Sequence, residues 1–382
     1  MRCPIIALAI LLAATIVHAK TGRSYYDAET MARVREKLER YDWARSQAAG
    51  IAASVEWIMQ MSDEQLWEFI PPPEQLRAIN VCHGTECPKC GNEGVKKAGH
   101  YPWIMSRDKP FKLECPACGS VLPENDFEGW NTGGKDAPPE TGERVIDRGV
   151  GWQNAEGHRF YFIPYYVFWQ RWYKDIIPVT RQLGQAYLVT GDARYAHKAA
   201  VLLARVAEMY ERFDYKTQCY HEGLFGVQGR ISDYIWTTGN NATFAEAYDA
   251  VWPVFDEDPE LTAFLAGKGI TDPRNVIEQK MLYVMVDDLL TGRAQGNMGH
   301  HQRTMCVMAL VLDNDDPALG PTKADLVKWL MAGEGRVEDL LWNGFWRDGL
   351  GGESSPSYAS GWCSSFYTIA ELLPRLGVDI WG

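Results

Sequence analysis

The feature that most constrains the fold is a helical spacing of apolar residues that starts near residue 160 and continues through the C-terminal half. One stripe joins Ile176, Val179, Leu183 and Tyr187, and it closes at Gly191. Residues three and four apart share one face of an α-helix, whereas strands alternate with period two, and no segment after residue 170 alternates in that way. Further stripes occur in 195–210, 277–285, 305–312, 326–341 and 366–373. The pattern predicts a mainly α fold of helical hairpins joined by short loops, closed into a ring or left as an open array.

The sequence divides into four expected parts. Residues 1–19 carry Arg2, an apolar run and a small-residue end at Ala19, which is typical of a secretory signal peptide and too short to span a membrane. Residues 20–80 are expected to form an N-terminal helical segment, and 81–150, rich in cysteine, glycine and proline, an inserted module. Residues 151–382 hold the main helical region. We therefore expect an exported protein, periplasmic or secreted, with no membrane span.

Composition limits the partners. The chain has 382 residues, of which 46% are hydrophobic and 23% charged, so it is globular. The formal net charge is −12 and no basic stripe is visible, which argues against nucleic acid as the partner. An acidic polymer would need a locally basic cleft, because salt screens the overall field over about 10 Å.

Two cysteine knuckles mark the inserted module. Cys87 and Cys90 form the first, Cys115 and Cys118 the second, and 24 residues separate them. Four thiolates at this spacing can close a tetrahedral zinc site, and the glycine after each knuckle lets backbone N–H groups turn toward sulfur. Because such a site leaves no open coordination position, its role would be structural. Disulfides are the competing interpretation, since an exported protein meets an oxidising environment.

A set of chemically active residues stands in two later segments. Asn297, His300 and His301 precede a helical stripe, and Tyr358 follows His301 by 57 residues in a segment that also holds Glu353. If the helix begins just after Asn297, then Asn297 and His301 lie on one face. A simpler interpretation makes Asn297 a helix cap, Glu353 a turn cap and Tyr358 a packing residue.

These segments resemble a known enzyme family. G-N-x-x-H-H-Q at the start of a helix, followed by G-G-E-S-S-P-x-Y, is similar to the heparinase II/III-like and alginate-lyase-type polysaccharide lyases. The C-P-x-C-G module with 123–127, and the stretch 156–162, resemble bacterial members of the group. The resemblance implies an incomplete (α/α) toroid with a zinc-ribbon-like insertion. The family's C-terminal β-sandwich would begin where this chain reaches Gly382, so we expect it to be absent.

The resemblance also implies an activity and residue roles. The reaction would be β-elimination on a uronic-acid polysaccharide, with no catalytic metal. Asn297 and His301 would neutralise the sugar carboxylate, with His300 as an alternative. Tyr358 would be the acid/base, and Glu353 would orient the histidine or the loop.

Physical reasoning adds substrate-binding candidates. Donors aligned on the carboxylate would stabilise the enolate that forms when the neighbouring carbon loses its proton. A phenol, whose ordinary pKa is about 10, needs nearby cations to act as a base. His301 or Arg230 would supply that charge. Trp236, Trp342 and Trp346 are candidate platforms for sugar rings.

Two rival functions remain open at this point. A glycoside hydrolase on a similar helical ring would use paired carboxylates such as Asp348 and Glu353, or Asp249. A non-catalytic glycan-binding protein would need only an aromatic cleft. An eliminase makes an unsaturated uronate that absorbs ultraviolet light, whereas a hydrolase or a binding protein does not.

Overall fold

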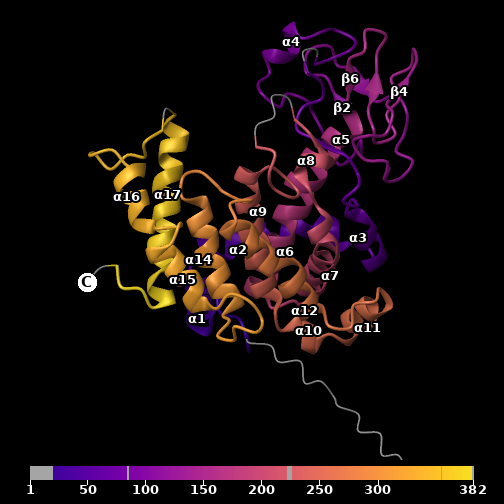
Figure 1. Cartoon of the computed structure of the whole chain (residues 1–382). Helices are drawn as coiled ribbons and strands as arrows, with labels where there is room; N and C mark the ends of the chain where they lie inside the picture. The colour runs from indigo at the N-terminus through magenta and orange to yellow at the C-terminus, as the bar shows by residue number, and fades with distance from the viewer. Residues whose placement is uncertain (1–19, 84–85, 222–225, 354, 381–382) are drawn as a thin grey trace, which may run out of the picture.

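The computed structural model describes residues 20–83, 86–221, 226–353 and 355–380, and this part of the chain is mainly helical (Figure 1). The expected signal peptide, residues 1–19, lies outside the described residues. The N-terminal segment forms three helices: α1 (Ala28–Arg40), α2 (Asp42–Met59) and α3 (Asp63–Phe69). Asp27 starts α1 by accepting the backbone N–H of Thr30 at 2.7 Å. Ser62 and Gln65 start α3 with a capping box.

Four helices form the centre of the molecule: α6 (Ile177–Thr190), α7 (Ala193–Met209), α9 (Tyr234–Val251) and α14 (His300–Leu312). Gly191 ends α6 in the left-handed conformation with φ of 75°, and Asp192 caps α7, which confirms two expected helices and the stop between them. Helix α9 packs against α6, α7 and α14. Because α9 is covered by all three, most of its residues are buried, including polar ones.

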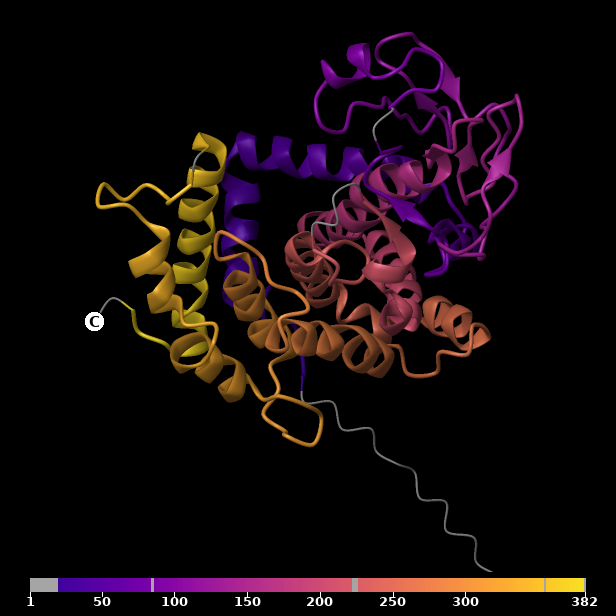
Figure 2. The ribbon, with the colours of Figure 1, turned by 45° about the horizontal axis from the view of Figure 1, so that its top comes forward.

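The C-terminal helices lie at one end of this array in both views (Figures 1 and 2). They are α15 (Lys323–Ala332), α16 (Val337–Gly344) and α17 (Pro356–Leu372). Helix α14 packs against both α15 and α17. The turn before α14 is therefore held close to α17.

The cysteine module, expected over residues 81–150, and the ten residues that follow it are built from short elements. They are α4 (Glu93–Lys96), β2 (Leu113–Glu114), β3 (Val121–Leu122), β4 (Glu140–Thr141), β5 (Trp152–Gln153) and β6 (Arg159–Phe160). Strands β2 and β3 pair antiparallel, and a second sheet has the order β4-β5-β6. Because β4 pairs with β5, the region of short strands continues past residue 150 to Phe160. Figure 1 shows the module and the N-terminal end of α17 on the same side of the helical array.

Shorter elements connect these parts. Strand β1 (Arg77–Ala78) pairs in parallel with β7 (Cys219–Tyr220), which ties the entry of the module to the chain before α9. The others are α5 (Phe162–Tyr166), η1 (Val167–Ile176), η2 (Tyr210–Arg212), α8 (Tyr215–Gln218), α10 (Val254–Glu257), α11 (Pro259–Gly267), α12 (Pro273–Ile277), η3 (Glu278–Leu282), α13 (Tyr283–Leu290) and η4 (Pro374–Leu376). Among the described helices, none has the length and apolar character needed to cross a bilayer.

A buried carboxylate anchors the segment before α1. Asp249 of α9 is fully buried and forms an ion pair with Lys20. Its two oxygens also accept the backbone N–H groups of Ser24 at 2.9 Å and Tyr26 at 2.7 Å. Lys20 donates in addition to the carbonyl oxygen of Val311 at 2.6 Å. This network fastens the N-terminal segment to α9 and α14.

Candidate functional site

A polar pocket lies between α6, α9 and α14, the helices at the centre of the array. Its volume is about 260 Å³. Nine residues line it: Arg181, Gly239, Asn240, Ala242, Thr243, Glu246, His300, Arg303 and Thr304. Each of the three helices contributes at least one charged or titratable side chain. The pocket is therefore a concave site with convergent polar groups, as small-molecule sites usually are.

One carboxylate and two guanidinium groups set the charge of this pocket. Glu246 is buried, and it lies 3.6 Å from Arg181 and 3.9 Å from Arg303. Burial raises the pKa of Glu246, while the two arginines act in the opposite direction. The Nε atoms of both arginines are buried and lack a hydrogen-bond partner among the described residues. Two partly exposed cations facing one carboxylate leave the pocket able to hold a further anionic group.

His300, the first residue of α14, lines the same pocket. Burial lowers the pKa of His300, and the positive charges of Arg303 and His301 lower it further. The imidazole is therefore neutral at neutral pH and can donate from one ring nitrogen while accepting at the other. The N-terminus of α14 adds its partial positive charge to this side of the pocket.

The turn before α14 differs from the expected helix start. The helix begins at His300, because Met298 and Gly299 have φ values of 54° and 73°, outside the helical region. Asn297 is exposed in the turn, and the N-cap position belongs to Gly299. The expectations that Asn297 caps the helix or shares a helical face with His301 are both wrong.

His301 is turned toward α15 instead of the pocket. Its Nδ1 lies 2.6 Å from the carbonyl oxygen of Gly296, so Nδ1 carries the proton and donates it. The ring also meets Trp329 of α15 edge to face, at 6.2 Å between centroids. Burial lowers the pKa of His301. These contacts favour a structural role for His301 and leave His300 as the pocket histidine.

Tyr358 lies in the first turn of α17, and its side chain is 54% exposed. A Cβ placed on Gly361 would come within 2.8 Å of the sulfur of Met298, so Met298 packs directly against α17 at Gly361. Tyr358 precedes Gly361 by three residues and lies on roughly the same helix face. The structure thus brings the N-terminal end of α17 to the turn that carries Asn297.

Glu353 contacts neither histidine. Its Oε1 accepts the indole N–H of Trp362 at 3.4 Å, and its backbone N–H donates to the carbonyl oxygen of Gly351 at 2.8 Å. Gly351 lies in the segment that leads into α17, and Trp362 lies in α17 itself. Of its two expected roles, the structure favours orientation of the loop.

The four expected substrate-binding residues have different surroundings. Arg230 is buried and donates to both carboxylate oxygens of Asp288, at 2.5 and 2.9 Å, so its charge is compensated inside the protein. Trp342 and Trp346 are exposed, in α16 and in the segment after it. Trp236 is half-buried in α9 and belongs to an aromatic cluster with Phe168, Trp169 and Tyr173. Only Trp236 lies on the helix that also forms the polar pocket.

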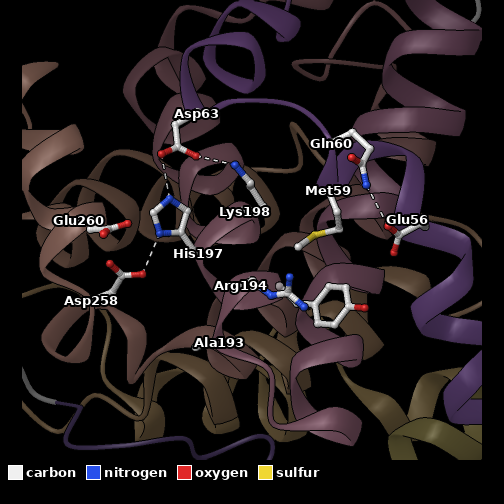
Figure 3. A pocket seen from close by; sticks show the side chains of 11 residues that line it. Glu56, Met59, Gln60, Asp63, Ala193, Arg194, His197, Lys198, Asp258 and Glu260 are labelled. Atoms are coloured by element: carbon white, nitrogen blue, oxygen red, sulfur yellow. Dashed lines mark hydrogen bonds and ion pairs between the residues drawn. The ribbon is translucent and has the colours of Figure 1, made fainter.

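A second, larger pocket of about 510 Å³ lies between α2, α3, α7 and α11 (Figure 3). His197 occupies its wall, with Nε2 at 3.0 Å from Asp63 and Nδ1 at 2.7 Å from Asp258. Lys198 donates to the other oxygen of Asp63 at 2.7 Å. Asp258 also caps α11. These groups satisfy one another, so we interpret them as a network that joins three helices.

The carboxylates considered for a hydrolase are not paired with one another. Asp249 forms the buried ion pair with Lys20 described above. Asp348 is exposed and accepts the backbone N–H of Leu350 at 3.1 Å. Glu353 bonds to Trp362. Each carboxylate therefore has a local partner of its own.

The four module cysteines form a cluster that could hold a metal ion such as zinc. Cys87, Cys90, Cys115 and Cys118 place their Sγ atoms within 4.8 Å of one another. The Cys87–Cys118 and Cys90–Cys115 distances are 3.9 and 3.7 Å. A tetrahedral site with Zn–S bonds of about 2.3 Å requires S–S edges of about 3.8 Å, whereas a disulfide bond measures about 2.0 Å. The donor set and its geometry fit a structural metal better than two bridges.

Several pocket residues escape the sequence analysis. Arg181, Asn240 and Glu246 lie in ordinary helical stretches without a motif, and Arg303 directly follows the H-H-Q segment without belonging to it. The available signal is the density of polar residues in 237–249, a run that is otherwise apolar enough for a buried helix. Polar groups inside such a helix need partners, and that need marks a network or a site.

Comparison of the chain with protein-family models, with curated proteins and with solved structures finds no match.

Proposed function

We propose that this protein is a polysaccharide lyase that cleaves a uronic-acid-containing glycan by β-elimination. In this proposal the helical hairpins form an incomplete (α/α) toroid, and the polar pocket between α6, α9 and α14 is its catalytic centre. One observation carries the proposal. The turn 297–299 and a pocket with two arginines both adjoin the start of α14, and this turn packs on α17 at Gly361, three residues after Tyr358.

The pocket supplies what a carbon acid next to a carboxylate requires. Arg181 and Arg303 would offset the charge of the substrate carboxylate, and neutral His300 would donate a hydrogen bond to it. His300 takes the role that the sequence analysis gave first to His301, because His300 lines the pocket and His301 does not. Asn297, exposed in the adjoining turn, would contact the sugar from outside. Donors fixed before the reaction stabilise the enolate without reorganisation, which is the usual source of large rate gains.

The chemical step moves one proton and breaks one bond. Tyr358, as phenolate, would take the proton from the carbon next to the carboxylate. The electron pair of that C–H bond would form the new carbon–carbon double bond, while the adjacent C–O glycosidic bond breaks. The leaving oxygen then takes a proton from the same phenol. The products are an unsaturated uronate end and a new hydroxyl end.

Two further attributes belong to the proposal. The four-cysteine cluster would bind zinc and stabilise the inserted module. The leader-like residues 1–19 would direct export to the periplasm or the exterior, where an acidic polysaccharide or oligosaccharide would be the partner.

The direct test is a substrate panel. Purified protein is mixed with alginate, heparan sulfate, chondroitin and hyaluronan, and the ultraviolet absorbance of unsaturated uronate ends is followed. The proposal predicts an increase with at least one polymer, and loss of that increase in Tyr358→Phe. If no polymer yields unsaturated ends, the proposed reaction is wrong.

A non-catalytic glycan-binding protein is the second candidate, favoured by the exposed indoles of Trp342 and Trp346. That function predicts binding without products, and equal binding by Tyr358→Phe. Replacing both tryptophans by alanine should then abolish binding.

A further inference from the structure

Tyr101 is an aromatic residue of the cysteine module that reaches the helical array. Its side chain is 40% exposed. One side of the ring packs on Trp169 of η1, at 4.3 Å between centroids, and its edge meets Trp236 of α9 at 6.2 Å. The rest of the ring faces solvent. One part of the Tyr101 ring is therefore packed on tryptophan, and the remaining part is accessible to a ligand, as an aromatic binding residue requires.

The segment that carries Tyr101 is fixed by the module itself. Trp103, two residues on, is buried and meets Phe162 edge to face at 5.8 Å. Ile104 exchanges two backbone hydrogen bonds with Glu114, at 3.0 and 2.9 Å. Glu114 directly precedes Cys115 of the four-cysteine cluster. The cluster is thus one residue away from the backbone pairing that positions Tyr101.

Tyr101 lies within electrostatic reach of α9 and of the start of α17. Burial raises the pKa of Tyr101, and the charged forms of Asp233 in α9 and Tyr358 in α17 would raise it further. Trp236, which the Tyr101 ring contacts, lies four residues before Asn240, a residue that lines the polar pocket. Residues four apart lie on the same face of a helix, so one face of α9 carries both the contact with Tyr101 and the wall of the pocket.

We propose that Tyr101 is a substrate-binding residue and that the cysteine module forms one wall of the glycan-binding cleft. The inference rests on the proposed function, of which it names the binding surface. A phenol suits this role because its apolar ring covers the C–H face of a sugar while its hydroxyl bonds to a sugar oxygen. Ligand sites also occur preferentially where two structural units meet.

Binding is measured separately from cleavage, on an array of acidic and neutral oligosaccharides that includes alginate, chondroitin and heparan fragments. For the best ligand, Tyr101→Ala should weaken binding about tenfold, which is about 1.4 kcal/mol. Tyr101→Phe should lose less, because it keeps the ring. Tyr367→Ala is the matched control, since Tyr367 is also an exposed tyrosine, and it should bind as the wild type does.

The module's metal provides an independent readout. Removing the metal with a chelator, followed by metal analysis, should weaken binding by the wild type about as much as Tyr101→Ala does. In Tyr101→Ala the same treatment should add little, because coupled changes are not additive. Circular dichroism of the helices reports whether the array stays folded.

The outcomes separate the two proposals. If the wild type binds a glycan, Tyr101→Ala binds it more weakly and no unsaturated product forms, the proposed lyase activity is refuted and the proposed binding role of Tyr101 stands. If Tyr101→Ala and the wild type bind equally well, the binding role of Tyr101 is refuted and the proposed lyase activity is unaffected. If the wild type binds no oligosaccharide of the array, both are refuted.

Discussion

Replacing Lys20 tests whether the N-terminal segment is fastened to the core by a buried ion pair. The side chains of Lys20 and Asp249 are 1% and 0% exposed. Lys20→Met removes the cation and leaves a buried carboxylate, a change that costs about 3–5 kcal/mol. Two backbone N–H groups still bond to Asp249 in the variant. We therefore expect a loss at the lower end of this range, so that the free energy of unfolding falls by about 3 kcal/mol.

Urea denaturation followed by tryptophan fluorescence and by circular dichroism measures this loss, and the two probes show whether unfolding occurs in one step. The double variant Lys20→Met with Asp249→Asn should recover part of the stability. Asparagine carries no charge that needs a partner, but it keeps an acceptor oxygen for only one of the two backbone N–H groups, which bond to different oxygens of Asp249.

An exposed ion pair supplies the control. Arg33 and Glu29 lie 3.7 Å apart on α1, with side chains 61% and 82% exposed. Arg33→Ala should change the unfolding free energy by less than about 1 kcal/mol. If Lys20→Met loses no more than Arg33→Ala, the buried-pair reasoning is refuted.

Three further predictions concern the pocket and the cysteine cluster. Arg303→Ala should weaken binding of a uronate oligosaccharide by about 1.5–3 kcal/mol, because it removes hydrogen bonds to a charged group. Isothermal titration calorimetry measures the affinity, with Arg33→Ala as the control. If the two variants bind the oligosaccharide equally well, the pocket does not bind the anion. Cys115→Ser should lose the bound metal, measured by elemental analysis, whereas Cys363→Ser should keep it; retention of metal by Cys115→Ser would contradict the four-thiolate site. Burial lowers the pKa of His300, so on acidification the unfolded chain takes up this proton before the folded chain does. The contribution of His300 to the unfolding free energy is therefore fully present above pH 6.5, and it is lost as the pH falls through the folded-state pKa. Proton NMR titration should place the His300 midpoint below 6.5, and a midpoint above that value would contradict the buried site.

The helical character of the chain could be predicted from its sequence because amphipathic spacing and caps are local properties. The stripe ending at Gly191 and the Asp192 cap became α6 and α7 with nearly the expected limits. The two cysteine knuckles likewise predicted a four-thiolate cluster, since metal ligands so close in sequence need only one turn each to converge.

The orientation of the two histidines depended on tertiary structure. Both occur in one motif, and the spacing alone made His301 the better partner of Asn297. The left-handed turn at Met298 and Gly299, packed against α17, moved the helix start to His300. Successive residues of a helix point about 100° apart, so His300 and His301 face different neighbours. As a result His300 entered the pocket and His301 turned to Trp329.

Sequence by itself determined the helices, the cysteine cluster and the residue types available for chemistry, because each depends on neighbours along the chain. Only the tertiary structure decided which charges meet: it enclosed Arg230 with Asp288 and Asp249 with Lys20, and it brought Arg181, Glu246 and Arg303 together from three helices. The physical reason is that an ion pair depends on separation in space and on burial. Neither quantity is visible in the spacing of residues far apart in sequence.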